Sequence, residues 1–203
     1  MRTISAFLAA LLTLTGYQVP AAEQISHYVI LVDDSSSNPL VIDTTHARRV
    51  AEDMAREITG FKMRDRITIT PLGRFGGNPI LETEVNKRLP PEQAMQSVKA
   101  MISEFPEAVK TVLGGPAPVT HIQGALQLVS SRVDCTKAKT FVFVLSDGRE
   151  TGDQLRIQPS FQGCEALTMI GVIGDTPIET ANIGASWKQW CEGAGFRHCK
   201  IIN

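Results

Sequence analysis

Aromatic residues are scarce in this chain, and positive charge is nowhere concentrated. Phe, Trp and Tyr make up 6% of the 203 residues, and the 20 Lys and Arg are spread along a sequence whose formal net charge is −1. Proteins that bind nucleic acid usually present clustered cations to the phosphates and aromatic rings to unpaired bases. We therefore expect no nucleic-acid partner.

The common catalytic motifs are also missing. The sequence contains no G-x-S-x-G nucleophile turn, no G-x-G-x-x-G and no G-x-x-x-x-G-K, and its 4 histidines show no metal-ligand spacing. These absences argue against a serine hydrolase of the usual type, a dinucleotide site, a P-loop and a zinc site. We expect a binding domain rather than an enzyme.

Long apolar runs are absent beyond the first residues. Arg2 is followed by the apolar residues 7–12 and then by the small residues Ala21 and Ala22. A basic N-terminus, a short apolar segment and small residues at a cleavage site are typical of a secretory signal peptide. A membrane span would need about 20 apolar residues. We expect residues 1–22 to be a signal peptide, with a buried N-terminal helix as the alternative. Residues 23–203 should then form one secreted domain without a membrane span, in a bacterial periplasm or outside the cell.

Two short apolar segments that each end in an acidic residue are the most informative feature present. Residues 29–32 lead into Asp33, and residues 141–145 lead into Ser146 and Asp147. Apolar runs of this length are typical of strands buried on both faces, as in a parallel sheet covered by helices. Ligands bind beyond the carboxyl ends of such strands. Functional residues are therefore expected at that edge.

Strand-like and helix-like segments alternate along the rest of the chain. This order predicts an α/β fold: a doubly wound, mostly parallel, six-stranded sheet with one short antiparallel edge strand and helices on both faces, in a Rossmann-like arrangement. Strands are expected at residues 27–33, 66–72, 80–85, 139–145, 167–173 and 196–202, and helices at residues 44–58, 91–105, 120–133 and 178–191. Residues 106–119 are expected to form a loop because they contain Gly and Pro repeatedly.

Four cysteines in a secreted domain favour disulfides, and none of their spacings is C-x-x-C. Three pairings are possible. We prefer Cys135 with Cys164, because each precedes an expected strand at the same end of the sheet. Cys191 and Cys199 flank a short Gly-rich turn and form the second expected pair. Reduced, buried thiols remain the alternative.

Five oxygen-bearing side chains are expected to converge at the carboxyl edge. In extended chain Asp33, Ser35 and Ser37 point to one side, and Asp147 follows a strand that we place beside the first. Thr120, at the start of a helix, adds a further hydroxyl. Oxygen ligands without His or Cys suit a hard cation such as Mg²⁺.

With these residues the chain resembles the von Willebrand factor A (vWA) family. That family's metal-ion-dependent adhesion site, MIDAS, has D-x-S-x-S after the first strand, a later Thr and an Asp after the fourth strand, matched here by Asp33, Ser35, Ser37, Thr120 and Asp147. The resemblance extends over nearly all of residues 23–203 through the order of elements. It implies bound Mg²⁺, with Mn²⁺ or Ca²⁺ as alternatives, and capture of an Asp or Glu of a partner protein without turnover.

The sequence departs from the family pattern at two positions. Many relatives have Gly where this chain has Ser36, and an apolar residue where it has Asn38. These changes leave the ligand set intact but alter how the loop bends.

Simpler interpretations of the same residues stay open. Thr120 with Gln123 also fits a helix capping box, the two serines fit a self-bonded turn, and Asp147 before Gly fits a strand-ending turn. We expect Asp34 to be solvated. Trp187 and Trp190, three residues apart on the last expected helix, are interpreted as core packing.

Two other functions compete with the binding module. A metal-dependent phosphohydrolase would use Asp33 as nucleophile, although such enzymes favour a second acid where this chain has Ser35. A structural subunit of a secretion, pilus or conjugation assembly would use the metal only to stiffen the loops.

Overall fold

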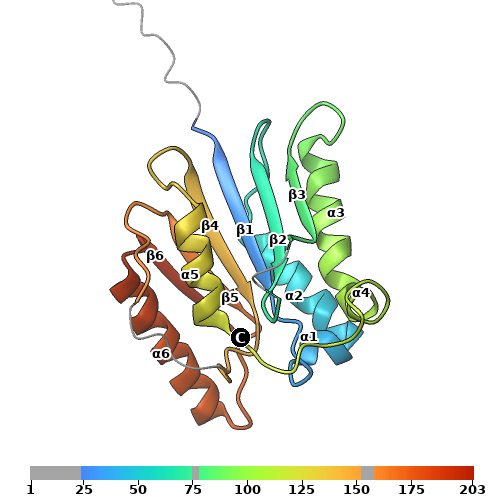
Figure 1. Cartoon of the computed structure of the whole chain (residues 1–203), viewed down its shortest axis with the longest axis vertical. Helices are drawn as coiled ribbons and strands as arrows, with labels where there is room; N and C mark the ends of the chain where they lie inside the picture. The colour runs from blue at the N-terminus through green and yellow to red at the C-terminus, as the bar shows by residue number, and fades with distance from the viewer. Residues whose placement is uncertain (1–23, 75–77, 152–157) are drawn as a thin grey trace, which may run out of the picture.

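Two layers of helices cover a six-stranded sheet (Figure 1). The structure is a computed structural model that describes residues 24–74, 78–151 and 158–203. The strands are β1 (Ser26–Val32), β2 (Arg66–Pro71), β3 (Leu81–Glu84), β4 (Lys139–Leu145), β5 (Ala166–Ile170) and β6 (His198–Ile202). Their order is β3-β2-β1-β4-β5-β6, and only β3 runs antiparallel to its neighbour. The expected fold class is confirmed.

The helices divide between the two faces of the sheet. They are α1 (Pro39–Ile42), α2 (Thr44–Glu57), α3 (Pro91–Ser103), α4 (Phe105–Thr111), α5 (Ile122–Arg132) and α6 (Pro177–Ala194). Helices α1 to α4 pack on one face, and α5 and α6 pack on the other. Within the described part of the chain, no helix is long and apolar enough to cross a membrane.

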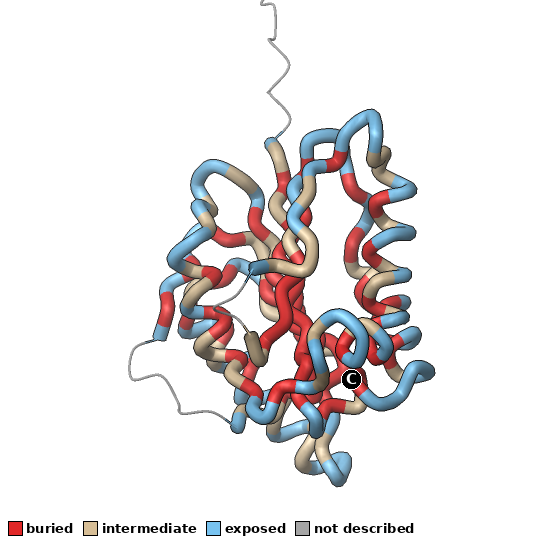
Figure 2. The backbone as a smooth tube through the Cα atoms, turned by 45° about the vertical axis from the view of Figure 1, so that its right-hand side comes forward, coloured by how far each residue is buried: buried red, intermediate tan, exposed pale blue. Residues whose placement is uncertain are grey.

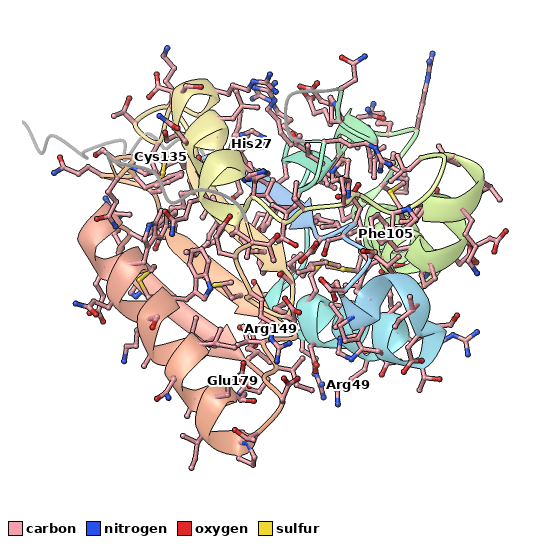
Figure 3. All side chains as sticks on the ribbon, turned by 60° about the horizontal axis from the view of Figure 1, so that its bottom comes forward. His27, Arg49, Phe105, Cys135, Arg149 and Glu179 are labelled. Carbon is pink, nitrogen blue, oxygen red and sulfur yellow. A yellow bond between two sulfur atoms is a disulfide. The ribbon has the colours of Figure 1, made fainter. Side chains whose placement is uncertain are left out.

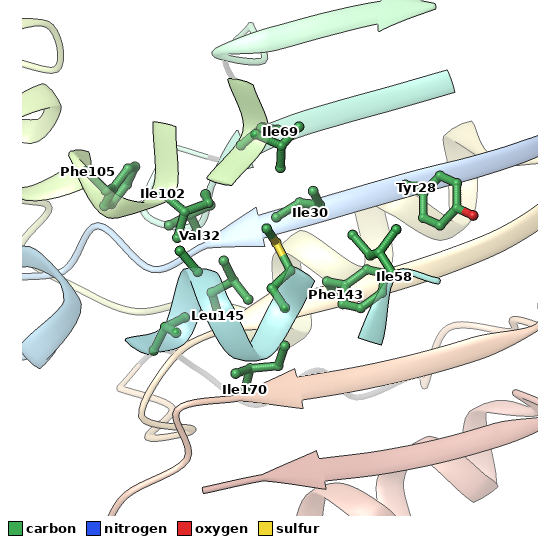
Figure 4. Packing of buried hydrophobic residues seen from close by; sticks show 14 of the residues in the cluster. Tyr28, Ile30, Val32, Ile58, Ile69, Ile102, Phe105, Phe143, Leu145 and Ile170 are labelled. Carbon is green, nitrogen blue, oxygen red and sulfur yellow. The ribbon is translucent and has the colours of Figure 1, made fainter. Parts of the chain in front are cut away.

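Strand β1 is buried on both faces, as its unbroken apolar sequence predicts. Ile30 and Val32 pack with α2 and α3, close to Ile69 and Phe143 (Figure 4). The alternate side chains, of which Leu31 is one, pack against α5 and α6. Figure 2 accordingly shows the central strands in red, the colour of buried residues. The carboxyl end of β1 is therefore held from both sides.

The structure differs most from the expected elements in three places, each for a local reason. Residues 105–111, placed mostly in a loop, form α4, because Pro106 occupies the first turn where a missing N–H costs little, and Phe105 and Val109 are fully buried. Helix α1, which was not expected, is too short to show a helical period. Strand β5 ends at Ile170 because Gly171 adopts φ +87°.

Both expected disulfides are confirmed. Cys135 bonds Cys164 across the amino ends of β4 and β5, with a Cα–Cα distance of 4.8 Å. Cys191 of α6 bonds Cys199 of β6, with a Cα–Cα distance of 6.0 Å. Two disulfides are typical of proteins that fold in an oxidising, extracellular or periplasmic compartment. The expected signal peptide, residues 1–22, lies outside the described residues.

Candidate functional site

The candidate site lies at the carboxyl edge of the central strands, at the lower end of Figure 1. The paired residues Val32 and Leu145 end β1 and β4, and the N–H of Asp33 donates to the carbonyl of Leu145 at 2.9 Å. The chain leaves these neighbouring strands in opposite directions, from β1 to β2 and from β4 to β5. In an open α/β sheet this reversal opens the crevice that binds ligands.

Asp33 and Asp147, the two expected acids, lie side by side. The hydroxyl of Ser146 donates to Asp33 Oδ2 at 2.7 Å and lies 3.5 Å from Asp147 Oδ1. Asp33 is fully buried, and Asp147 is 5% exposed. Two carboxylates from distant parts of the sequence thus share one hydroxyl in a buried place.

The surroundings of Asp147 disfavour its charge. Burial raises the pKa of its carboxyl, and the nearby Asp33 carboxylate raises it further. The backbone N–H of Arg149 opposes this effect by donating to Asp147 Oδ1 at 2.9 Å. A cation between the two acids would remove their mutual repulsion and favour both charged forms.

The loop that follows β1 presents Ser35 and Ser37 differently. The N–H of Ser35 donates to Asp33 Oδ1 at 3.0 Å, and Ser35 pairs with Ala117 in a bridge between two loops. Ser35 is buried, with its hydroxyl oxygen unbonded, whereas Ser37 is exposed. Asn38 ends the loop by capping α1 through its side-chain oxygen at 2.9 Å from the N–H of Leu40. The hydroxyl of Ser35 is thus not used by the turn.

Thr120 is buried beside the loop that carries Asp147. Its N–H donates to Thr151 Oγ1 at 2.8 Å, and the N–H of Thr151 donates to the carbonyl of Thr120 at 3.2 Å. The alternative of a capping box at Thr120 was wrong. The N–H of Gln123 instead donates to Glu150 Oε2 at 2.9 Å, and the N-cap residue of α5 is His121.

Asp34 is fully buried, so the expectation that it is solvated was wrong. In extended chain it points away from Asp33, toward the loop after β2. There it accepts from the N–H of Gly73 at 2.6 Å and from Arg74 Nη1 at 2.5 Å. Arg74 Nη2 also donates to the carbonyl of Gly115 at 2.7 Å, so this contact joins three loops. Burial raises the pKa of Asp34, while Gly73 and Arg74 oppose the rise.

Glu150 is a site residue that sequence reasoning missed. One of its oxygens holds the first turn of α5, and the other is buried without a hydrogen-bond partner. Burial raises its pKa, and the Asp33 carboxylate contributes to the same direction. Its segment was expected to be irregular, so no periodicity marked it. The only feature of the sequence that could have indicated Glu150 as a site residue is its position, three residues after Asp147.

Helix α6 fixes the Asp147 loop from outside. Trp187 is 6% exposed, and its ring N–H donates to the carbonyl of Gly148 at 2.7 Å. Arg149 forms ion pairs with Asp175 at 2.7 Å and with Glu179 at 3.2 Å. Figure 3 shows Arg149 and Glu179 close together. Trp190 packs against Trp187, so the interpretation of these tryptophans as packing residues is confirmed.

Unpartnered polar atoms gather in the same two loops. Among the described residues, the buried side-chain nitrogen and oxygen atoms without a hydrogen-bond partner are Ser35 Oγ, Asn38 Nδ2, Arg149 Nε and Glu150 Oε1. Buried polar atoms are nearly always satisfied, because leaving one unbonded costs about 1–3 kcal/mol. Several such atoms in two neighbouring loops are typical of a binding site for a polar ligand or an ion.

The donor set fits a hard cation better than a metal that prefers nitrogen or sulfur ligands, such as zinc. Within the described ranges, no group of three or more His, Cys, Asp or Glu side chains is placed to hold a metal. The candidate set instead has two carboxylates and three hydroxyls, of which Ser35 Oγ is buried and unbonded. Oxygen ligands of this kind, completed by water, are the ones that Mg²⁺ accepts.

Comparison with known proteins gives no family. No protein-family model matches the sequence, and no curated protein matches it. The resemblance to vWA domains therefore rests on the residues of this chain alone.

Proposed function

We propose that this chain is a metal-dependent protein-binding module. Asp33, Ser35, Ser37, Thr120 and Asp147 are the proposed ligands of Mg²⁺, with Mn²⁺ or Ca²⁺ as alternatives. An Asp or Glu of a partner protein would complete the coordination shell. No covalent step is part of this proposal, and the vWA-like motif supports it by resemblance.

The observation that supports the proposal most is the pairing of buried acids beside an unbonded hydroxyl. Asp33 and Asp147 contact the same Ser146 hydroxyl, and the buried Ser35 Oγ adjoins this pair in sequence without a hydrogen bond of its own. Without a cation, two carboxylates held this close repel each other. A bound divalent cation would remove the repulsion between the two carboxylates, and it would also give the unbonded Ser35 hydroxyl oxygen a partner.

The charge of the proposed shell explains why it would capture an anion. Two carboxylates balance the charge of a divalent cation, while serine and threonine hydroxyls add none, so the bound metal stays electrophilic. Asp33 is fully buried but Ser37 is exposed, which leaves the side next to Ser37 open to the solvent. A partner carboxylate would approach from that side.

The cellular setting is part of the same proposal. Two disulfides indicate an oxidising compartment, and residues 1–22 have the pattern of a signal peptide. We place the module in the periplasm or outside a bacterial cell, where its partner would be another secreted or surface protein.

Calorimetric titration with Mg²⁺ tests the proposal. We expect one site in the wild-type protein and at least about a tenfold loss of affinity in Asp33→Asn and Asp147→Asn. Both changes keep side-chain size, and the asparagine introduced in Asp147→Asn still offers an oxygen to the N–H of Arg149. The control is Asp134→Asn, because Asp134 precedes β4 at the opposite end of the sheet and pairs with Lys137 rather than with a residue of the site. Equal affinity in all four proteins would overturn the proposed ligand set.

A further inference from the structure

Large apolar side chains are exposed mainly at the edge that carries the candidate site. Among the described residues they are Ile42, Met63, Val112, Val119, Ile173 and Ile178. All except Met63 belong to loops or helix ends at the carboxyl edge of the sheet, at the lower end of Figure 1. We call Ile42, Val112, Val119, Ile173 and Ile178 the apolar rim.

Two members of the apolar rim directly adjoin the candidate site. The N–H of Ile173 donates to the carbonyl of Asp147 at 3.1 Å, and Val119 precedes Thr120 in the chain. Their exposures are 41% and 37%. Ile178 follows in the first turn of α6, next to Glu179, and is 75% exposed. Exposed apolar side chains gathered in one region are typical of protein-binding surfaces.

Two of the described cations beside the site, Arg149 and Arg74, are already paired with acids of the chain. Arg149, close to Glu179 in Figure 3, bonds both Asp175 and Glu179. Arg74 bonds the buried Asp34. Asp175 is also largely exposed, so an acidic side chain of a partner placed opposite it would meet repulsion.

We infer that the partner presents a single acidic residue flanked by aliphatic or aromatic side chains, and not an acidic cluster. This inference rests on the proposed function, since the carboxylate is held through the metal. The flanking side chains would cover Val119, Ile173 and Ile178 and remove their apolar surface from water. The metal would select the acid, and the apolar rim would select its neighbours.

A displayed library of disulfide-closed peptide loops tests this inference. The loops carry random residues and are selected on the wild-type protein in Mg²⁺, with a parallel selection in chelator. We expect Mg²⁺-dependent clones to carry one Asp or Glu with apolar residues on both sides. Clones rich in adjacent acids, or an absence of Mg²⁺-dependent clones, would overturn the inference.

Variants of the apolar rim complete the test. For the selected peptides we expect Ile173→Ser and Ile178→Ser each to weaken binding by about fivefold or more, because each removes apolar contact area. Met63→Ser, at the opposite end of the sheet, is the matched control and should bind normally. Mg²⁺-dependent acidic peptides that bind all of these variants equally would refute the inference but leave the proposed function standing. Peptides that bind equally in chelator would refute the proposed function itself.

Discussion

Ser146 Oγ donates a 2.7 Å hydrogen bond to Asp33 Oδ2, a residue 113 positions earlier in the chain. The same oxygen accepts the N–H of Gly148 at 3.0 Å and lies 3.5 Å from Asp147 Oδ1. One small side chain thus sets the separation of the two candidate ligand carboxylates and the course of the loop between them.

Replacing Ser146 by Ala should therefore weaken the fold as well as the site. The change leaves the Gly148 N–H and a buried Asp33 oxygen without their partner, which costs about 1–3 kcal/mol in the free energy of unfolding. Urea denaturation measures this cost. Ser130→Ala is the control, because its hydroxyl bonds only the carbonyl of Gln127 on the surface of α5. Equal stability of the two variants would contradict the role given to Ser146.

The effects of substituting Arg74 and Asp34 on the free energy of unfolding should be coupled. Arg74→Met leaves Asp34 fully buried and without its cation, so we expect a loss of about 1–3 kcal/mol, moderated because the Arg74 side chain is 34% exposed. Asp34→Asn should lower the free energy of unfolding much less in the Arg74→Met variant than in the wild-type protein. A double-mutant cycle from chemical denaturation measures the coupling. Strictly additive losses would show that the pair is not an energetic unit.

Gly73 is required by close packing between loops. A Cβ at this position would lie 2.1 Å from the Cβ of Ala117 and 2.8 Å from Asp34 Oδ1. Gly73→Ala should destabilise the protein by about 1–3 kcal/mol, and Ala117→Gly in addition should restore part of the loss. Gly184→Ala is the control, since its nearest neighbour would be an ordinary contact at 3.4 Å and alanine favours the helix. Thermal denaturation ranks the variants, and no rescue by Ala117→Gly would contradict this packing.

Stability should fall on mild acidification because of His27. Burial lowers the pKa of His27 below 6.5, and the Arg66 guanidinium lowers it further. The unfolded chain then binds more protons than the folded one between the folded pKa and 6.5. The contribution of His27 to stability is therefore complete above pH 6.5 and is lost as the pH falls toward the folded pKa. His46 is shifted in the same direction by burial and Arg49.

The variant His27→Gln isolates this effect. Glutamine does not titrate but still offers a hydrogen bond to Thr68, whose hydroxyl lies 3.0 Å from the His27 ring. The fall in Tm between about pH 7.5 and about pH 5 should be smaller in the variant than in the wild-type protein. An equal fall in both proteins would show that His27 does not carry the dependence.

The sheet and its order were predictable because the signal lies within short segments. Residues 29–32 and 141–145 are apolar without interruption, which is typical of a strand buried on both faces, and the acids at their ends indicated the edge of the candidate site. Helix α4 was not predictable in this way. From the sequence, Pro106 predicts the end of a helix rather than its start. Only the structure shows that Phe105 and Val109 are buried in the core and hold α4 in place.

The site was predictable only in part, because its supporting contacts join residues far apart in sequence. The meeting of Asp33 with Asp147 follows from strand adjacency, which alternation of elements predicts. The burial of Asp34 depends on Gly73 and Arg74, 39 and 40 residues away, and nothing in the sequence around Asp34 indicates them. The same holds for Glu150, whose partner is a backbone N–H of a different element.

A titration with Mn²⁺ followed by NMR of the backbone amides tests the central claim most directly. Paramagnetic broadening falls steeply with distance, so one bound ion should first erase the signals of residues around Asp33, Ser35, Thr120 and Asp147, and excess Mg²⁺ should restore them. Broadening centred on any other part of the fold, or none beyond that of free Mn²⁺, would contradict the claim that these side chains hold a divalent cation.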